Sequence, residues 1–292
     1  QINKKPGHNI GYFNLHGVQD GPNWYGQKDF SSTSTGPDYP IALTPGMFNE
    51  QTPAPQITFT EVCYGANVIN KQHEEALSLK FLDTGAQTFV GSTCISYGSV
   101  TPPLVSADYL AEKFWQRVFS GEAVGFALMK AKLSLVEEMS NTQGYLDGED
   151  QKTVLSFVLF GDPLQIYEDN NAGPKPFYRV NRTRQIKTIS DSQMQQDIER
   201  AEVPTKVNTY AKKIVEKYLP GLQNAELQYT KSYSTRELNQ DKSFFTRFST
   251  PSEHYLITLQ KSFENNAHTK HTHFARMTFN KKGKLVKFTT SR

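Results

Sequence analysis

The 292-residue sequence predicts an α/β fold with a mainly parallel sheet, followed by a small α+β domain. Strand-like and helix-like segments alternate in the first half, which is typical of a parallel sheet. The charge also changes sign along the chain. Residues 1–163 hold 10 Lys and Arg against 17 Asp and Glu, a balance of −7, whereas residues 164–292 hold 22 against 12, a balance of +10. We therefore expect one domain over 1–168, a linker or wrapping segment over 169–204, and a second domain over 205–292.

The elements of the first domain follow from residue type and spacing. β-Branched and aromatic residues between glycine breaks predict strands, and these are 9–17, 56–65, 86–95 and 153–163. Apolar residues at helical spacing predict helices, and these are 74–85, 104–121 and 123–139. The last strand is a continuous apolar run, which predicts a central buried strand. The segments expected as loops are 18–55 and 140–152.

The second domain is expected to hold one helix and an antiparallel sheet. The residues at 205–221 have the spacing of a helix, and a Pro-Gly pair ends it. Strands are expected at 253–265 and, on both sides of a Lys-Gly turn, within 273–292.

Several classes of protein are disfavoured by composition. No apolar run reaches the ~18 residues of a membrane span, and no leader peptide is visible. Hydrophobic residues make up 37% of the chain, which is enough for a core and argues against general disorder. Two cysteines, Cys63 and Cys94, are too few for a disulfide framework or a multi-thiolate zinc site. No phosphate-binding glycine loop and no nucleic-acid motif is found, so we expect no nucleic-acid partner.

His16, Gly17 and Cys63 are the residues best placed to carry chemistry. His16 and Cys63 each come just after a predicted strand, and the carboxyl ends of parallel strands meet at one edge of a sheet. An imidazole beside a thiol can generate a nucleophilic thiolate, and a glycine N–H can help to hold an oxyanion. The alternative is structural, because a lone Cys is often a small buried hydrophobe and a lone His is often a hydrogen-bonded surface or core residue.

The residues around these positions resemble the caspase-like cysteine peptidases. "YFNLHG" and "TEVCYGAN" are similar to their His-Gly and nucleophile-Cys strands. The order of "ALSLKFLDTGAQTFVGSTCISYGSV", a long helix pair and "LSFVLFGDPLQIY" resembles the catalytic half of the gingipain family over residues 9–167. The resemblance implies a caspase-like three-layer sandwich. It also implies a cysteine endopeptidase that needs no cofactor and acts on peptide or protein substrates.

The resemblance further implies a role for each matching residue. Cys63 would be the nucleophile, His16 the general acid/base, and the backbone N–H groups of Gly17 and Cys63 the oxyanion hole. The stretch "STCISYGS" would line the pocket for the side chain before the cut, with Ser96 and Tyr97 nearest. Tyr97 could equally be an ordinary packed aromatic residue.

Two residues near the site have open interpretations. Trp24 would contact substrate as part of the cleft wall, unless it pins its loop to the surface. Glu61, two residues before Cys63, is interpreted as an edge residue or as support behind the site.

The sequence departs from the family upstream of the His-Gly strand. There the family has further strands, which supply the acid that orients the histidine and the acid of the pocket for basic side chains. Neither acid can be located in this sequence. We therefore expect an autoprocessed enzyme that pairs with an amino-terminal chain of the same precursor. Cleavage after Arg or Lys and an extracellular or cell-envelope location are implied by the family alone.

Two clusters of polar residues could bind metal. Asp147, Glu149 and Asp150 lie close together, and carboxylate oxygens can hold calcium, which family members often bind. A solvated acidic loop that caps the next strand is the favoured alternative. His268, His271 and His273 are interpreted as part of a solvated polar hairpin rather than as zinc ligands.

The role expected for the second domain follows from its pattern and its charge. Its pattern faintly resembles the small PepSY-type domains found in or beside protease propeptides. Because its positive charge complements the acidic first half, we expect it to dock there and to restrain or stabilise the catalytic part. A catalytically inactive caspase-like scaffold that binds a partner, and a non-peptidase hydrolase or transferase, are the alternative functions.

Overall fold

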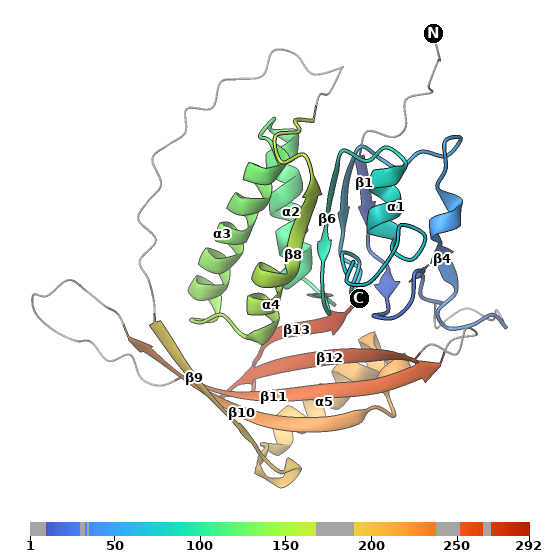
Figure 1. Cartoon of the computed structure of the whole chain (residues 1–292). Coiled ribbons are helices and arrows are strands. Elements are labelled where there is room, and N and C mark those ends of the chain that lie inside the picture. Colours follow the sequence, from blue (N-terminus) through green and yellow to red (C-terminus); the bar gives the residue numbers. More distant parts are fainter. Residues whose placement is uncertain (1–9, 30–32, 34, 168–189, 238–251, 265–269) are drawn as a thin grey trace, which may run out of the picture.

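The computed structural model describes residues 10–29, 33, 35–167, 190–237, 252–264 and 270–292. The described chain forms two larger sheets and one small sheet (Figure 1). Within this part of the chain, no helix is both long enough and apolar enough to cross a bilayer.

The first sheet has the order β1-β5-β6-β8. Its strands are β1 (Ile10–Phe13), β5 (Ile57–Thr60), β6 (Thr88–Ser92) and β8 (Phe157–Gly161). β1, β5 and β6 are parallel, and β8 runs antiparallel to β6. The predicted α/β fold with a parallel-containing sheet is therefore confirmed.

Apolar side chains hold helices against this sheet. The helices are α1 (Leu77–Asp83), α2 (Ser106–Phe119), α3 (Val124–Thr142) and α4 (Gly148–Ser156). Phe59 and Val90 share a buried cluster with residues of α2 and α3. Phe89 instead packs against Phe81 of α1, with ring centroids 5.8 Å apart. Since successive strand residues point to opposite faces, Phe89 and Val90 bury the two faces of β6.

A small sheet redirects the chain after β1. It consists of β2 (His16–Gly17), β3 (Trp24–Tyr25) and β4 (Ile41–Leu43), and the 3-10 helix η1 (Pro45–Met47) follows it. β3 pairs antiparallel with both β2 and β4. His16 therefore lies at the start of a new strand, just beyond the carboxyl end of β1.

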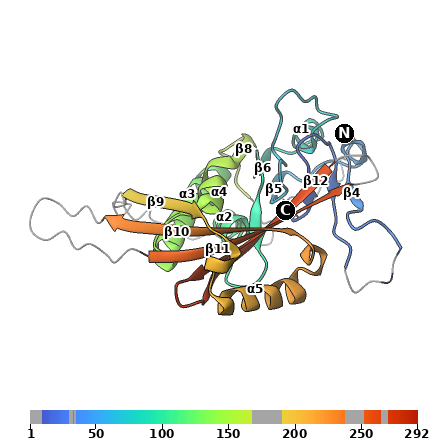
Figure 2. The same cartoon turned by 90° about the horizontal axis from the view of Figure 1, so that it is seen from below.

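The second large sheet is antiparallel and has the order β7-β13-β12-β11-β10-β9. Its strands are β7 (Tyr97–Ser99), β9 (Ser190–Asp197), β10 (Glu226–Glu237), β11 (Ser252–Glu264), β12 (Lys270–Asn280) and β13 (Leu285–Ser291). Helix α5 (Thr205–Tyr218) lies along it (Figure 2), flanked by the 3-10 helices η2 (Arg200–Glu202) and η3 (Pro220–Leu222). Because β7 comes from the first half of the chain, this sheet joins both halves.

The two faces of the second sheet meet different partners. Met277 of β12 and Phe288 of β13 share a buried cluster with residues of α5. The neighbouring residues Arg276 and Lys287 form ion pairs with acidic side chains in and beside α4. Alternation along β12 and β13 therefore separates an apolar face from a basic face.

Two sequence predictions for the first half are wrong. The apolar run at 153–163 is not one central strand, because its first residues end α4 and the rest form β8 at the edge of the sheet. The expected loop at 140–152 is largely helical, since α3 extends to Thr142 and α4 begins at Gly148. The side chain of Asp147 caps α4 by accepting a hydrogen bond from the backbone N–H of Asp150.

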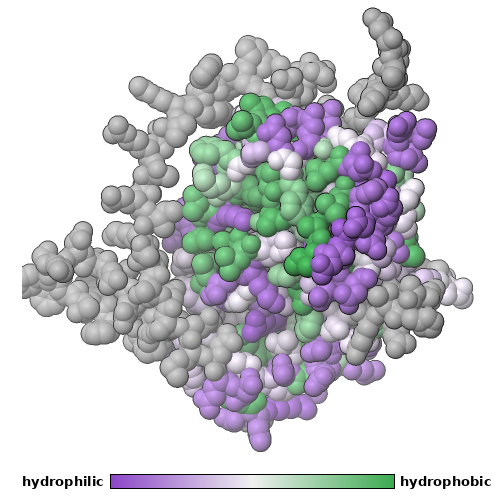
Figure 3. Space-filling model, in the orientation of Figure 1, coloured by the Kyte–Doolittle hydropathy of each residue, from purple (hydrophilic) through white to green (hydrophobic). Residues whose placement is uncertain are grey.

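Hydrophobic side chains gather on one face of the first half, in the region of α3 and β8 (Figure 3). Large exposed hydrophobic residues of α3, α4 and the segment after β8 are Phe126, Met129, Leu133, Leu155, Leu164 and Ile166. Exposed apolar area of this kind commonly contacts another molecule.

Candidate functional site

His16 and Cys63 lie at matching positions beyond two adjacent parallel strands. β1 and β5 pair from Ile10 opposite Ile57 to Phe13 opposite Thr60. His16 and Cys63 each come three residues after the last of these pairs. The expectation that the two strands are neighbours and run in the same direction therefore agrees with the structure.

Gly17 allows these two strand ends to come together. A Cβ atom on Gly17 would lie 2.1 Å from the carbonyl oxygen of Cys63 and 2.4 Å from a methyl carbon of Val62. No side chain fits at such distances. The absence of a side chain at position 17 thus brings the backbone of the His-Gly strand against the cysteine.

The imidazole of His16 is enclosed by polar and aromatic groups. Its exposed fraction is 7%. Its Nε2 lies 3.1 Å from Oε1 of Gln27, and its ring centroid is 5.1 Å from that of Tyr39 and 5.4 Å from that of His273. Burial lowers the pKa of His16, the bond to Gln27 opposes this, and the charge of Arg292 lowers the pKa further. Burial therefore favours the neutral imidazole.

The thiol of Cys63 is buried against Ser96. The backbone N–H of Ser96 donates to Sγ of Cys63 over 3.2 Å, and the thiol lies 3.5 Å from the carbonyl oxygen of Ser96. Burial raises the pKa of the Cys63 thiol to about 12, although backbone hydrogen bonds from Ser96 and Arg292 oppose that shift. The next residue, Tyr64, has a positive φ of 58°, an uncommon conformation for a non-glycine residue that often marks functional sites.

Arg292 lies directly beside this thiol. β13 pairs antiparallel with β7, with Ser291 opposite Tyr97. The backbone N–H of Arg292 continues this pairing by donating to the carbonyl oxygen of Ser96 over 3.0 Å. That oxygen also faces the Cys63 thiol. The main chain of Arg292 and the thiol of the candidate nucleophile therefore contact the same carbonyl oxygen.

The side chain of Arg292 fills an acidic pocket. Its Nη2 lies 3.1 and 2.8 Å from the two carboxylate oxygens of Asp108 and donates to the carbonyl oxygen of Ser99 over 3.3 Å. Its Nε lies 3.6 Å from Oε2 of Glu61. A Cβ atom on Gly98 would come within 2.3 Å of the guanidinium group. Two carboxylates and a bare glycine backbone therefore form a slot of the shape that an arginine requires.

Glu61 is part of this pocket, and the interpretation of it as an edge residue is corrected. Its side chain is fully buried, and one oxygen accepts a hydrogen bond from the hydroxyl of Tyr12. Burial raises the pKa of Glu61 to about 8, the charge of Asp108 raises it, and the charge of Arg292 lowers it. A bound guanidinium group therefore favours the ionised form of Glu61.

The other residues predicted for substrate binding separate into two groups. Ser96 and Tyr97 lie at the pocket, since Ser96 contacts both Cys63 and Arg292 and Tyr97 pairs with Ser291. Trp24 does not form an open cleft wall, because its ring is 4% exposed and packs 5.6 and 5.7 Å from the rings of Phe13 and Phe81. Trp24 and Cys63 both line a cavity of only about 10 Å³. Packing in the core therefore accounts for the position of Trp24 better than substrate contact does.

The three carboxylates considered for calcium surround a lysine instead. Nζ of Lys287 lies 2.8 Å from Oδ2 of Asp147 and 2.8 Å from Oδ1 of Asp150. Arg276 pairs with Glu149 at 2.5 Å. Among the described residues, no group of three or more His, Cys, Asp or Glu side chains could hold a metal ion. Because the ammonium group occupies the centre of the cluster, these residues do not fit a calcium site.

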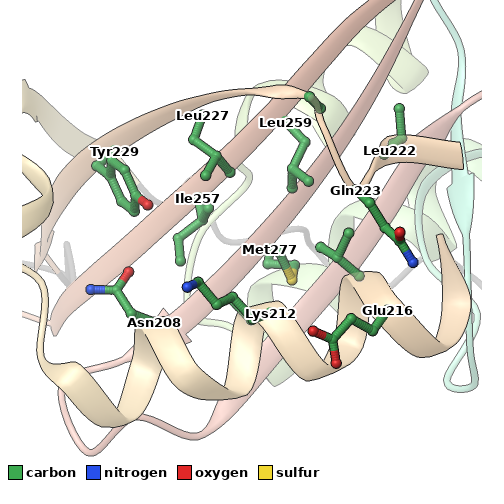
Figure 4. Close-up of a pocket in the computed structure, with 13 residues that line it drawn as sticks. Asn208, Lys212, Glu216, Leu222, Gln223, Leu227, Tyr229, Ile257, Leu259 and Met277 are labelled. Atoms are coloured by element: carbon green, nitrogen blue, oxygen red, sulfur yellow. The ribbon is translucent and has the colours of Figure 1, made fainter. Parts of the chain in front are cut away.

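A cavity in the second half of the chain lies away from this chemistry. It has a volume of about 480 Å³ between α5 and the outer face of the second sheet. Figure 4 shows its lining, which includes Lys212 and Glu216 of α5 and the apolar side chains of Ile257, Leu259 and Met277. Since none of the residues that line it belongs to the Cys63 site, we do not interpret it as the reaction centre.

Sequence reasoning missed several residues of the site. Asp108 stands in the first turn of α2 without a motif to mark it. Gln27 lies in a segment expected as a loop. His273 is not part of a solvated hairpin, because it is 4% exposed and its Nδ1 lies 3.1 Å from the hydroxyl of Tyr39. His268 lies outside the described residues. The sign change in charge was the one available signal that basic residues of the second half meet acidic residues of the first.

Comparisons with known proteins bear on the first half of the chain. Searches of curated proteins and of solved structures each found no match. A model of peptidase family C25 matches residues 13–165, a span that contains His16, Cys63 and both carboxylates of the arginine pocket. Since this match covers just over half of the 292 residues, the chain belongs to peptidase family C25, the gingipain family of clan CD cysteine peptidases.

Proposed function

We propose that the protein is a cysteine endopeptidase that cleaves on the carboxyl side of arginine, with Cys63 as the nucleophile and His16 as the general acid/base. The observation that carries the proposal is the position of Arg292. Its guanidinium group is held by Asp108 and faces Glu61, while its backbone N–H is bonded to Ser96 beside Cys63. A substrate bound in this way would present the carbonyl carbon of its arginine to the thiol.

The reaction uses groups that this chain supplies. His16 takes the proton of the Cys63 thiol, and the resulting thiolate attacks the carbonyl carbon while the backbone N–H groups of Gly17 and Cys63 stabilise the oxyanion. His16 gives a proton to the leaving amine as the C–N bond breaks, and the acyl group remains on sulfur as a thioester. A water molecule, deprotonated by His16, then hydrolyses the thioester and restores the thiol.

The pocket favours arginine over lysine. Nη2 of Arg292 reaches both oxygens of Asp108, and its Nε faces a second carboxylate, that of Glu61. A lysine ammonium is a compact point charge on a different stem and cannot meet both carboxylates with the same planar geometry. We therefore expect arginine substrates to be cleaved faster than lysine substrates.

A matched set of fluorogenic peptides tests the reaction. Peptides that differ only in Arg, Lys or Ala before the fluorophore would be incubated with the full chain, with Cys63→Ala, and with Cys94→Ala as the control for the second cysteine. We expect release from the Arg peptide that Cys63→Ala abolishes and Cys94→Ala retains. A peptide-based arginyl alkylating probe, followed to completion by mass spectrometry, should modify Cys63 alone. Failure of the probe to modify both the folded full chain and folded Arg292→Ala, which empties the arginine pocket, would favour the inactive scaffold.

Asp108→Asn tests the proposed specificity. Loss of the charge-assisted contacts should lower kcat/KM for the Arg peptide by about 10- to 100-fold, because hydrogen bonds to charged groups contribute about 1.5–3 kcal/mol. The Ala peptide should be affected little. Glu112→Gln on the same helix serves as the control, since its carboxylate pairs with Lys113 and lies outside the pocket. Equal losses for both peptides would contradict the assignment of Asp108 as the residue that selects arginine.

A further inference from the structure

The end of β13 lies across the active site in an extended conformation. Thr289, Thr290 and Ser291 pair antiparallel with Ser99, Gly98 and Tyr97, respectively. The N–H of Arg292 then bonds to the carbonyl oxygen of Ser96. An extended peptide that adds to an exposed strand in this way obtains its affinity from main-chain hydrogen bonds and its specificity from alternate side-chain pockets.

Arg292 supplies the specific contact of this segment. Its guanidinium group occupies the slot formed by Asp108, Glu61 and Gly98, and its side chain is 18% exposed. If the proposed function is correct, this slot receives the arginine of the substrate. The segment and a substrate therefore compete for the same carboxylates and for the same carbonyl oxygen of Ser96.

The second sheet also covers His16. The His273 ring lies 5.4 Å from that of His16, and its Nε2 is 2.6 Å from the hydroxyl oxygen of Thr290. Tyr39 contacts both histidines and packs 5.1 Å from the ring of Phe263 on β11. Both members of the proposed dyad are thus buried beneath the sheet, and that burial favours the neutral thiol and the neutral imidazole.

A second anchor holds the same strand in place. Lys287 lies on β13, five residues before Arg292. Its ammonium group is buried among Asp147, Glu149 and Asp150. Arg276 of β12 pairs with Glu149 beside it. The strand is therefore tied to the first half at both ends by basic side chains in acidic sites.

We propose that residues 289–292 act as an internal substrate mimic. They occupy the groove beside Cys63 that would hold the substrate residues before the cleaved bond, and they must leave before a substrate can bind. The inference rests on the proposed function, because it assigns a tethered occupant to that same arginine pocket. The four residues Thr-Thr-Ser-Arg stand in for the substrate residues that precede the cleaved bond. The full chain is consequently a restrained peptidase whose activity rises when Arg292 is withdrawn.

The rate at which Cys63 is modified tests this proposal. The full chain, Arg292→Ala and Lys284→Ala would each be treated with the arginyl alkylating probe. Lys284 is an exposed residue of the turn before β13 and controls for loss of a positive charge near this strand. We expect Arg292→Ala to react at least about tenfold faster than the full chain, which corresponds to about 1.4 kcal/mol. Its KM for the Arg peptide should fall while kcat is retained, and Lys284→Ala should match the unchanged chain.

Adding the segment back in trans provides the second measurement. The peptide acetyl-Lys-Phe-Thr-Thr-Ser-Arg should inhibit Arg292→Ala competitively, and the same peptide with Ala in place of Arg should inhibit at least about tenfold less. Thermal unfolding of each variant shows whether the fold is retained.

The outcomes separate the two proposals. If the full chain and Arg292→Ala are modified completely and at equal rates, Arg292 does not restrain the site and the internal mimic is wrong, while the peptidase stands. If both chains remain folded and Cys63 of neither reacts with the arginyl probe, although iodoacetamide modifies it in Arg292→Ala, the proposed arginine-specific peptidase itself is wrong.

Discussion

Glu61 is fully buried, yet its carboxyl group lies in a pocket that binds a cation. Burial and the neighbouring Asp108 raise its pKa from the ordinary 4.5 to about 8, and the charge of Arg292 opposes this. The folded protein therefore holds a proton on Glu61 more tightly than the unfolded chain does. Raising the pH from about 5 to about 8 forces a charge into this site, so the contribution of Glu61 to stability falls over that range.

Glu61→Gln should remove this pH dependence. Between about pH 5 and about pH 8, the free energy of unfolding should fall less in the variant than in the unchanged chain, because the amide does not titrate. Urea unfolding at several pH values measures the difference. Glu226→Gln controls for the general loss of a carboxylate, since Glu226 is exposed on β10. A Glu61→Gln curve parallel to that of the unchanged chain would show that Glu61 does not titrate in this window.

At the same scale, the positions of Cys63 and His16 beyond neighbouring parallel strands could be predicted from the sequence, whereas the pocket could not. A cysteine and a histidine that follow strand-like segments are recognisable, because parallel strands bring their carboxyl ends to one edge. Helix α1 and strands β6 and β7 separate Cys63 from Asp108 along the chain. Only the tertiary structure brings Asp108 into contact with Ser99 and Arg292. The partner of Glu61 is more than 200 residues away along the chain.

Among the elements, α4 and β13 interact through a buried ionic cluster. Burial alone would lower the pKa of Lys287, but the three carboxylates raise it, so the lysine stays charged. Burial would likewise raise the pKa of Asp147, and the charge of Lys287 holds it below its ordinary value. Burial and the charge of Asp147 raise the pKa of Asp150 to about 7. The cluster is stable because each buried charge has an opposite charge in contact with it.

Lys287→Met should destabilise the protein by about 3–5 kcal/mol, because it leaves several carboxylates buried without their lysine. The midpoint of urea unfolding measures the loss. Lys284→Met is the matched control, and because Lys284 is exposed its effect should stay within about 0.5 kcal/mol. Equal midpoints for the two variants would mean that the ion pairs contribute nothing to stability.

Elements in which apolar residues recur with a clear helical or strand period were predictable, and elements without such a period were not. Helices α2, α3 and α5 follow from apolar residues at helical spacing, and β5 and β6 from β-branched and aromatic runs. The prediction of one strand at 153–163 was wrong because a continuous apolar segment does not distinguish the end of a helix from a strand. β10 is rich in polar residues, so it showed no apolar alternation that could predict a strand.

For the whole molecule, the opposite charges of the two halves have a structural counterpart. Arg276, Lys287 and Arg292 come from the basic second half and pair with acidic residues of the first half. The sequence predicted that the two halves attract each other, since their balances are −7 and +10. It could not predict the docking surface, because net charge carries no information on which strand of the sheet enters which groove.

The shortness of β7 has a consequence for turnover. Only three of its residues pair with β13. Long unpaired strands recruit other chains and promote aggregation, whereas very short ones avoid this hazard. If β13 withdraws, the exposed edge of β7 can bind a peptide through a few main-chain hydrogen bonds and then release the cleaved product. The same edge is too short to nucleate aggregation.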